Sequence, residues 1–171
     1  MTRLCAAAIA RNYGATVIST TRRSDRETLL KEHGATHVVI DTGEISDAVH
    51  KLYPKGVNKV LELVGTTTLL DSIQCAGEAG IVCLTGMVGN AWGLSDFQPM
   101  ESIPTSVCLT CYSGGNEDFM ATPYDELINQ IEDGRLSVQI GKVFHIDEIV
   151  EAHRCMEENR YDRSCMLGGL Y

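Results

Sequence analysis

The chain has 171 residues, of which 44% are hydrophobic and 22% charged, and its formal net charge is −9. The length fits one domain, and the negative charge argues against nucleic acid or an anionic membrane as the main partner. No apolar run is long enough to cross a bilayer, and the first residues show no clear signal-peptide cleavage pattern. We therefore expect a globular protein with neither a nucleic-acid nor a membrane partner.

The sequence contains seven cysteines, an odd number, and most lie inside apolar segments. This pattern favours reduced, buried thiols in a cytoplasmic protein over a disulfide framework. Cys108 and Cys111 are the only close pair. Side chains three positions apart on a strand point to opposite faces, so we interpret both as ordinary strand residues, with a redox or zinc role as the alternative.

Helical and strand patterns alternate through the first half of the chain. We expect helices over 4–13, 24–32, 45–52 and 69–75, and strands over 15–21, 37–40, 57–65 and 80–84. Ser24 and Glu27 have the spacing of a capping box. The run from Val57 to Gly65 is almost continuously apolar, which is typical of a strand buried on both faces of a parallel sheet. The alternation predicts an α/β fold, a parallel sheet flanked by helices.

The second half has a less regular pattern. A loop over 88–100 contains the only tryptophan, and an edge strand follows over Ile103–Tyr112, behind Pro104. A helix over 124–133, a strand over 142–145 and a helix over 148–159 capped by Asp147 complete the expected order. With no repeat and no linker, we interpret residues 1–171 as one nucleotide-binding domain.

Several short motifs in the right order resemble the medium-chain dehydrogenase/reductase superfamily. They are Tyr13-Gly14-Ala15-Thr16-Val17-Ile18, Glu62-Leu63-Val64-Gly65, Leu84-Thr85-Gly86-Met87 and Glu151-Ala152-His153-Arg154-Cys155-Met156-Glu157. The similarity covers roughly 6–160 and is nearest to the zinc-independent, quinone-oxidoreductase-like branch, often filed with zinc-binding alcohol dehydrogenases. It implies a Rossmann-like NADP(H)-binding domain. In the family, a separate barrel-like N-terminal domain supplies most of the substrate site, and nothing in this sequence corresponds to it.

The sequence departs from the family pattern at both ends. The family's first strand and its glycine-rich turn, which binds the pyrophosphate, would precede the helix that begins near Leu4. We therefore expect a fold without that central strand, in which the strands over 15–20 and 57–64 either pair directly or leave backbone groups unpaired. The segment from Asp162 to Gly169 differs from the apolar strand that ends the family domain.

The resemblance also implies which residues bind the cofactor. Thr20, Thr21 and Arg22 end a strand that meets the adenine ribose in dinucleotide folds. An acidic residue there would bind a free 2′-hydroxyl, whereas hydroxyls and the Arg22 and Arg23 cations favour a 2′-phosphate; the alternative is a solvated basic pair.

Two further strand ends line the cofactor in the family. They are Leu63, Val64 and Gly65, and Thr85, Gly86 and Met87, where glycine allows close approach of a ligand. Plain turn chemistry is the alternative explanation for these glycines.

The functional expectation follows from the same resemblance. The intact enzyme would transfer a hydride from NADPH to a quinone or conjugated carbonyl, its small-molecule substrate, without zinc. No residue has the partners of a nucleophilic or acid–base site, no histidine spacing suggests a metal site, and His153 is interpreted as a packing residue and Glu62 as structural. Whether this chain is itself an enzyme stays open. The alternative is a non-catalytic fragment or interaction module, and we expect a homodimer through Ile103–Tyr112.

Overall fold

The computed structural model describes residues 2–158 and 164–168. Its contacts divide the chain into two compact units. We call residues 18–122 the middle unit, and residues 1–17 together with 123–171 the terminal unit, after their places in the sequence. The assignment of all 171 residues to one nucleotide-binding domain stays a prediction.

The middle unit contains two parallel sheets. Strands β1 (Ile18–Thr21) and β2 (His37–Ile40) form one, and β3 (Val57–Glu62), β4 (Ala76–Leu84) and β5 (Cys108–Cys111) form the other in the order β3–β4–β5. The helical elements of this unit are η1 (Ser24–Arg26), α2 (Glu27–Glu32), α3 (Ser46–Leu52), α4 (Thr66–Gln74), α5 (Pro99–Ser102) and α6 (Asn116–Met120). Among the described residues, no ladder joins the two sheets.

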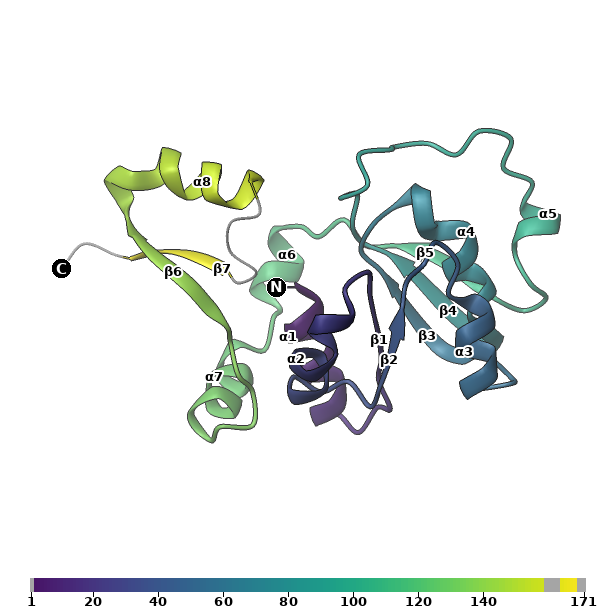
Figure 1. Cartoon of the computed structure of the whole chain (residues 1–171), viewed down its shortest axis with the longest axis horizontal. Helices are drawn as coiled ribbons and strands as arrows, with labels where there is room; N and C mark the ends of the chain where they lie inside the picture. Colours follow the sequence, from purple (N-terminus) through teal and green to yellow (C-terminus); the bar gives the residue numbers. More distant parts are fainter. Residues whose placement is uncertain (1, 159–163, 169–171) are drawn as a thin grey trace. The chain divides into compact units, whose positions relative to one another are not determined.

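Helix α4 covers one face of the β3–β4–β5 sheet, with α3 beside it (Figure 1). The parallel register aligns Val60 with Val82 and Val82 with Leu109 across the three strands. Because alternate strand residues share a face, these side chains meet Leu69 and Ile73 of α4 in one core cluster. Burial of this apolar surface holds the helix on the sheet.

The terminal unit contains a smaller parallel sheet and three helices. Its elements are α1 (Thr2–Asn12), α7 (Tyr124–Glu132), β6 (Ile140–His145), η2 (Ile146–Glu148), α8 (Ile149–Glu157) and β7 (Ser164–Gly168). Strand β6 pairs with β7, and Phe144, Ala152 and Cys155 form a buried cluster between β6 and α8. The described part of the tail, Ser164–Gly168, therefore forms a strand although its sequence departs from the family pattern; Asp162, Arg163 and Gly169 lie outside the described residues.

The parallel α/β architecture is confirmed, and the differences concern element ends. Strand β5 is only four residues long, because a turn from Pro104 to Val107 with Ser106 at φ 64° precedes it. The capping box expected at Ser24 does not form, since the chain tightens there into η1 without a side-chain cap. Ahead of the last helix, His145 is the N-cap of η2 and forms a capping box with Glu148, while Asp147 lies inside η2 and is not that cap. Within residues 2–158 and 164–168, no helix is both long and apolar enough to span a membrane.

Candidate functional site

The site begins where β3 and β4 end, because the carboxyl ends of neighbouring parallel strands meet at one edge of a sheet. The backbone N–H of Thr85 donates to the Glu62 carbonyl at 2.9 Å, which extends the ladder past both strands. Leu63 and Val64 are half-buried, as are Thr85, Gly86 and Met87, while Gly65 is buried. The structure therefore brings together the two segments that the sequence assigned to the cofactor, 63–65 and 85–87.

The two glycines of these segments are required by the contact between the strand ends. Gly65 has φ +115°, and a Cβ added there would lie 3.1 Å from the Gly86 carbonyl oxygen. A Cβ on Gly86 would collide with the Leu63 carbonyl. The neighbouring backbone is sufficient to explain both glycines, as the turn-chemistry alternative requires, and their role in the approach of a ligand stays a prediction.

The third predicted segment, Thr20 to Arg22, lies at the end of β1 and is tied to β2. The Asp41 N–H, directly after β2, donates to the Thr21 carbonyl at 2.8 Å. The Thr21 side chain is only 6% exposed, and its hydroxyl accepts from the Arg23 N–H at 3.2 Å. Thr21 therefore shapes its own turn, and the half-buried Thr20 and the exposed Arg22 are the side chains that a ligand can reach.

An acidic residue from the end of the neighbouring strand β2 lies beside Arg22, although the end of β1 itself carries none. Asp41 Oδ2 is 3.8 Å from Arg22 Nε, and the Arg22 side chain is 75% exposed while that of Asp41 is 18% exposed. Asp41 Oδ1 also accepts from the Gly43 N–H at 2.9 Å. The sequence contained the signal for this pair, since Asp41 directly follows a strand expected to lie beside the one ending at Thr21.

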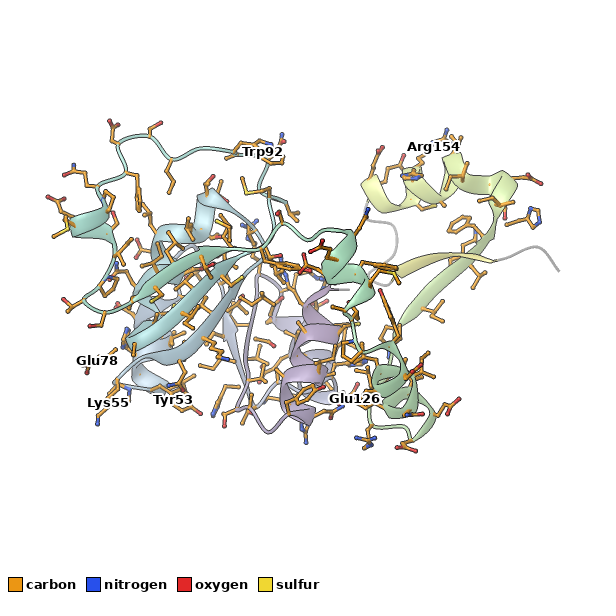
Figure 2. The ribbon with its side chains drawn as sticks, turned by 180° about the vertical axis from the view of Figure 1, so that it is seen from behind. Tyr53, Lys55, Glu78, Trp92, Glu126 and Arg154 are labelled. Carbon is orange, nitrogen blue, oxygen red and sulfur yellow. The ribbon has the colours of Figure 1, made fainter. Side chains whose placement is uncertain are left out.

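The loop after β4 was not recognised as part of the site from sequence. The Gly89 N–H donates to the Val64 carbonyl at 2.7 Å, and the Thr66 hydroxyl donates to the Ala91 carbonyl at 2.7 Å. These bonds hold the loop on the end of β3 and the start of α4. Trp92, the next residue, is 79% exposed, and Figure 2 shows it at the far end of the middle unit from Lys55 and Glu78.

Glu62 makes the hydrogen bonds expected of a structural residue, since it is 4% exposed and accepts from backbone groups. His153 is different, because its side chain is exposed and not packed. In the part of the chain that the structure describes, no group of three or more His, Cys, Asp or Glu side chains could hold a metal ion. The Cys108 and Cys111 thiols are exposed and free.

With this geometry in place, the comparisons with known proteins define the class. Residues 4–132 match the family model described as zinc-binding dehydrogenase. The chain belongs to this family, and its resemblance to the medium-chain dehydrogenase/reductase superfamily is confirmed. A curated relative named "probable quinone oxidoreductase" from Leishmania amazonensis is 32% identical over 95 residues, which is 55% of this chain and 26% of the relative.

Solved structures share the fold over nearly the whole chain. The crystal structure of AibC matches with a TM-score of 0.83 at 22% identity, covering 98% of this chain and 46% of that one. The Escherichia coli quinone oxidoreductase, solved in complex with NADPH, matches with a TM-score of 0.78 at 19% identity, covering 97% of this chain and 53% of that one. The chain therefore spans about half the length of these structures and carries a fold like that of Rossmann-type domains.

Proposed function

We propose that this chain is the NADP(H)-binding part of a medium-chain oxidoreductase that reduces a quinone or a conjugated carbonyl without zinc. The adjoining strand ends 63–65 and 85–87 carry the proposal, because five of their six residues are half-buried and they lie at the edge where dinucleotides bind in open α/β folds. Bound NADPH would supply the hydride, and the residues of this chain would bind and orient it. The relatives named for quinone reduction support the substrate class.

The choice of NADPH over NADH rests on Arg22. Its guanidinium is 75% exposed at the end of β1, where a 2′-phosphate could accept charge-assisted hydrogen bonds. Asp41 opposes this choice, since its carboxylate already attracts the same guanidinium and could bind a free 2′-hydroxyl. The proposal is that the phosphate displaces Asp41 from Arg22.

Titration of the purified chain with NADPH and NADH tests the proposal. Arg22→Asp should reverse the order of the two affinities, because losing a charge-assisted hydrogen bond weakens binding about ten- to a hundredfold. Asp41→Asn should instead increase the preference for NADPH. Lys55→Asp makes the same change of charge in the turn that precedes β3, away from the carboxyl ends of the strands, and should leave the order intact. Equal binding of both cofactors by every variant would contradict the assignment.

A second candidate function is an interaction module without catalysis that associates through a sheet edge. Strand β5 favours it, since among the described residues β5 pairs only with β4 and its outer edge is left without a partner strand. The same edge supports the expected homodimer. Dimerisation without any dinucleotide binding would favour this module over the oxidoreductase.

The proposal places the protein in the cytoplasm. None of the six cysteines whose side chains the structure describes is in a disulfide, and reduced thiols persist in a reducing compartment.

A further inference from the structure

Glu62 is a buried carboxylate at the end of β3 whose hydrogen bonds join the turn after β3 to helix α4. Its Oε1 accepts from the Val64 N–H at 2.6 Å and from the Gly65 N–H at 3.1 Å. Its Oε2 accepts from the hydroxyl of Ser72 on α4, which is 5% exposed. One side chain therefore satisfies two backbone donors of the turn and links that turn to the covering helix.

The shape of this turn determines where the next loop lies. The turn packs so closely on β4 that a Cβ at Gly65 would be 3.1 Å from the Gly86 carbonyl oxygen, which leaves little room for another conformation. On its other side, the Val64 carbonyl holds the Gly89 N–H at 2.7 Å. The turn thus connects the buried Glu62 carboxylate with the loop that leads to Trp92.

We propose that Glu62 is a positioning residue: its carboxylate holds the 63–65 turn, and through Val64 it holds the loop over 87–92, in the geometry of the candidate cofactor site. The effect on the loop depends only on the contacts above, whereas an effect on NADPH binding rests on the proposed function. Glu62 acts through the reach and direction of its hydrogen bonds and not through its charge.

Two substitutions separate reach from charge. Glu62→Gln keeps the length of the side chain, so its amide oxygen can accept from the Val64 and Gly65 N–H groups while its NH2 donates to the Ser72 hydroxyl. Glu62→Asp keeps the charge but is one methylene shorter, and it cannot reach both the turn and Ser72. If Glu62 acts by positioning, the loop should keep its geometry in Glu62→Gln and lose it in Glu62→Asp. If Glu62 acts by its charge, the loop should keep its geometry in Glu62→Asp and lose it in Glu62→Gln.

Asp71, next to Ser72 on α4, offers a matched control. The Asp71 carboxylate also accepts two backbone N–H groups, those of Ile45 at 2.7 Å and Ser46 at 3.2 Å. These bonds hold the start of α3 and do not involve the loop after β4. Asp71→Ala should therefore lower the stability of the same unit without moving Trp92.

Fluorescence anisotropy of Trp92, the only tryptophan of the chain, measures how firmly the loop is held. The full-length protein is used, at a temperature where circular dichroism shows that each variant is folded. Glu62→Asp should lower the anisotropy, and Glu62→Gln and Asp71→Ala should match the parent. If Glu62→Asp does not fold, Ser72→Ala, which removes only the bond to Oε2, takes its place. The proposal is overturned if Glu62→Asp, or its substitute Ser72→Ala, has the same anisotropy as the parent. It is also overturned if Glu62→Gln or Asp71→Ala loses as much anisotropy as Glu62→Asp does.

NADPH titration of the same variants distinguishes this inference from the proposed function. If both hold, NADPH binds about tenfold more weakly to Glu62→Asp than to Glu62→Gln, a difference of about 1.4 kcal/mol. If no variant and no parent binds NADPH, the proposed function fails while the anisotropy result still decides the role of Glu62.

Discussion

At the residue scale, the surroundings of the Cys75 thiol change its pKa. It is 3% exposed at the C-terminal end of α4, and burial, with smaller contributions from the charges of Asp71 and Glu62, raises its pKa to about 12 from the ordinary 9.0. Because the thiolate is the reactive form, a maleimide at pH 8 should modify the exposed Cys108 and Cys111 and leave Cys75 unmodified in the folded chain. Mass spectrometry of the digested adduct measures this.

The same shift in pKa predicts a dependence of stability on pH. Between about pH 9 and pH 12 the unfolded chain has lost the Cys75 proton while the folded chain keeps it, so stability falls as pH rises through this window. Cys75→Ala should flatten the loss seen by urea denaturation, and Cys108→Ala, at an exposed position, should not. An unchanged slope in Cys75→Ala would show that other groups cause the alkaline loss.

At the residue scale, the sequence predicted the segments of the candidate site better than the reasons for them. Segments 63–65 and 85–87 do adjoin, because both directly follow parallel strands. The sequence could not show that a neighbouring carbonyl requires Gly86, or that Thr21 turns its hydroxyl onto its own backbone. Both depend on local geometry that residue types alone do not encode. Asp41, by contrast, directly follows a predicted strand, so its place beside the end of the β1 strand was predictable from the sequence.

At the element scale, a buried amide links α1 and α7, two helices of the terminal unit. Gln130 of α7 is 2% exposed, and its Oε1 accepts from Asn12 Nδ2 at 2.8 Å; the same nitrogen donates to the Arg135 carbonyl at 3.0 Å. Asn12→Ala removes the donor and leaves the buried oxygen unpaired, so we expect a loss of roughly 1–3 kcal/mol in the free energy of unfolding.

Asn129→Ala is the matched control for this prediction, since Asn129 lies exposed on the same helix and its loss should change stability by less than about 0.5 kcal/mol. Urea denaturation of both variants measures the difference. Equal stability of the two variants would mean that water satisfies Gln130 once Asn12 is gone.

Elements with a strong apolar period were predictable, and elements set by local backbone geometry were not. The sequence located β2, β3 and α7 closely, because the two strands are short apolar runs and α7 has a 3.6-residue apolar period. It missed α6 and the first four residues of β4, where Gly77 and Glu78 give no strand pattern. The His145 cap was also missed, since histidine is not among the usual N-cap residues.

At the scale of the whole molecule, the outer edge of β5 supports association of two copies. The Tyr112 N–H donates to the Leu84 carbonyl on β4, and because donors alternate along a strand, the Cys111 N–H faces the outer edge. Cys111→Pro removes that donor and leaves the β4 ladder intact, so it should weaken a dimer that light scattering detects in the parent chain. Cys111→Val keeps the N–H and should dimerise as the parent does. A parent chain that is monomeric at high concentration would remove the prediction.

The β1–β2 sheet and the β3–β4–β5 sheet are not joined by a ladder among the described residues. Of the two outcomes considered for the strands over 15–20 and 57–64, direct pairing is wrong: among the described residues β1 pairs only with β2, and β3 only with β4. Each strand therefore has one edge without a ladder. The resemblance places the family's first strand between these two edges, and the sequence could anticipate this gap only through that resemblance.

The unpaired edges predict that the middle unit is marginally stable and binds NADPH weakly until a strand fills them. Each buried, unsatisfied backbone group costs about 1–3 kcal/mol, and a domain is stable by only about 5–15 kcal/mol, so a few such groups can remove the whole margin. Adding the N-terminal half of a related family member, with its first strand and glycine-rich turn, should raise both the melting temperature and the NADPH affinity of the chain. The matched control is the same half with proline substituted at two alternate positions of that strand, which removes the ladder donors and should abolish both gains. A cooperative transition above about 65 °C for the chain alone, unchanged by the added half, would show that the sheets are completed in another way.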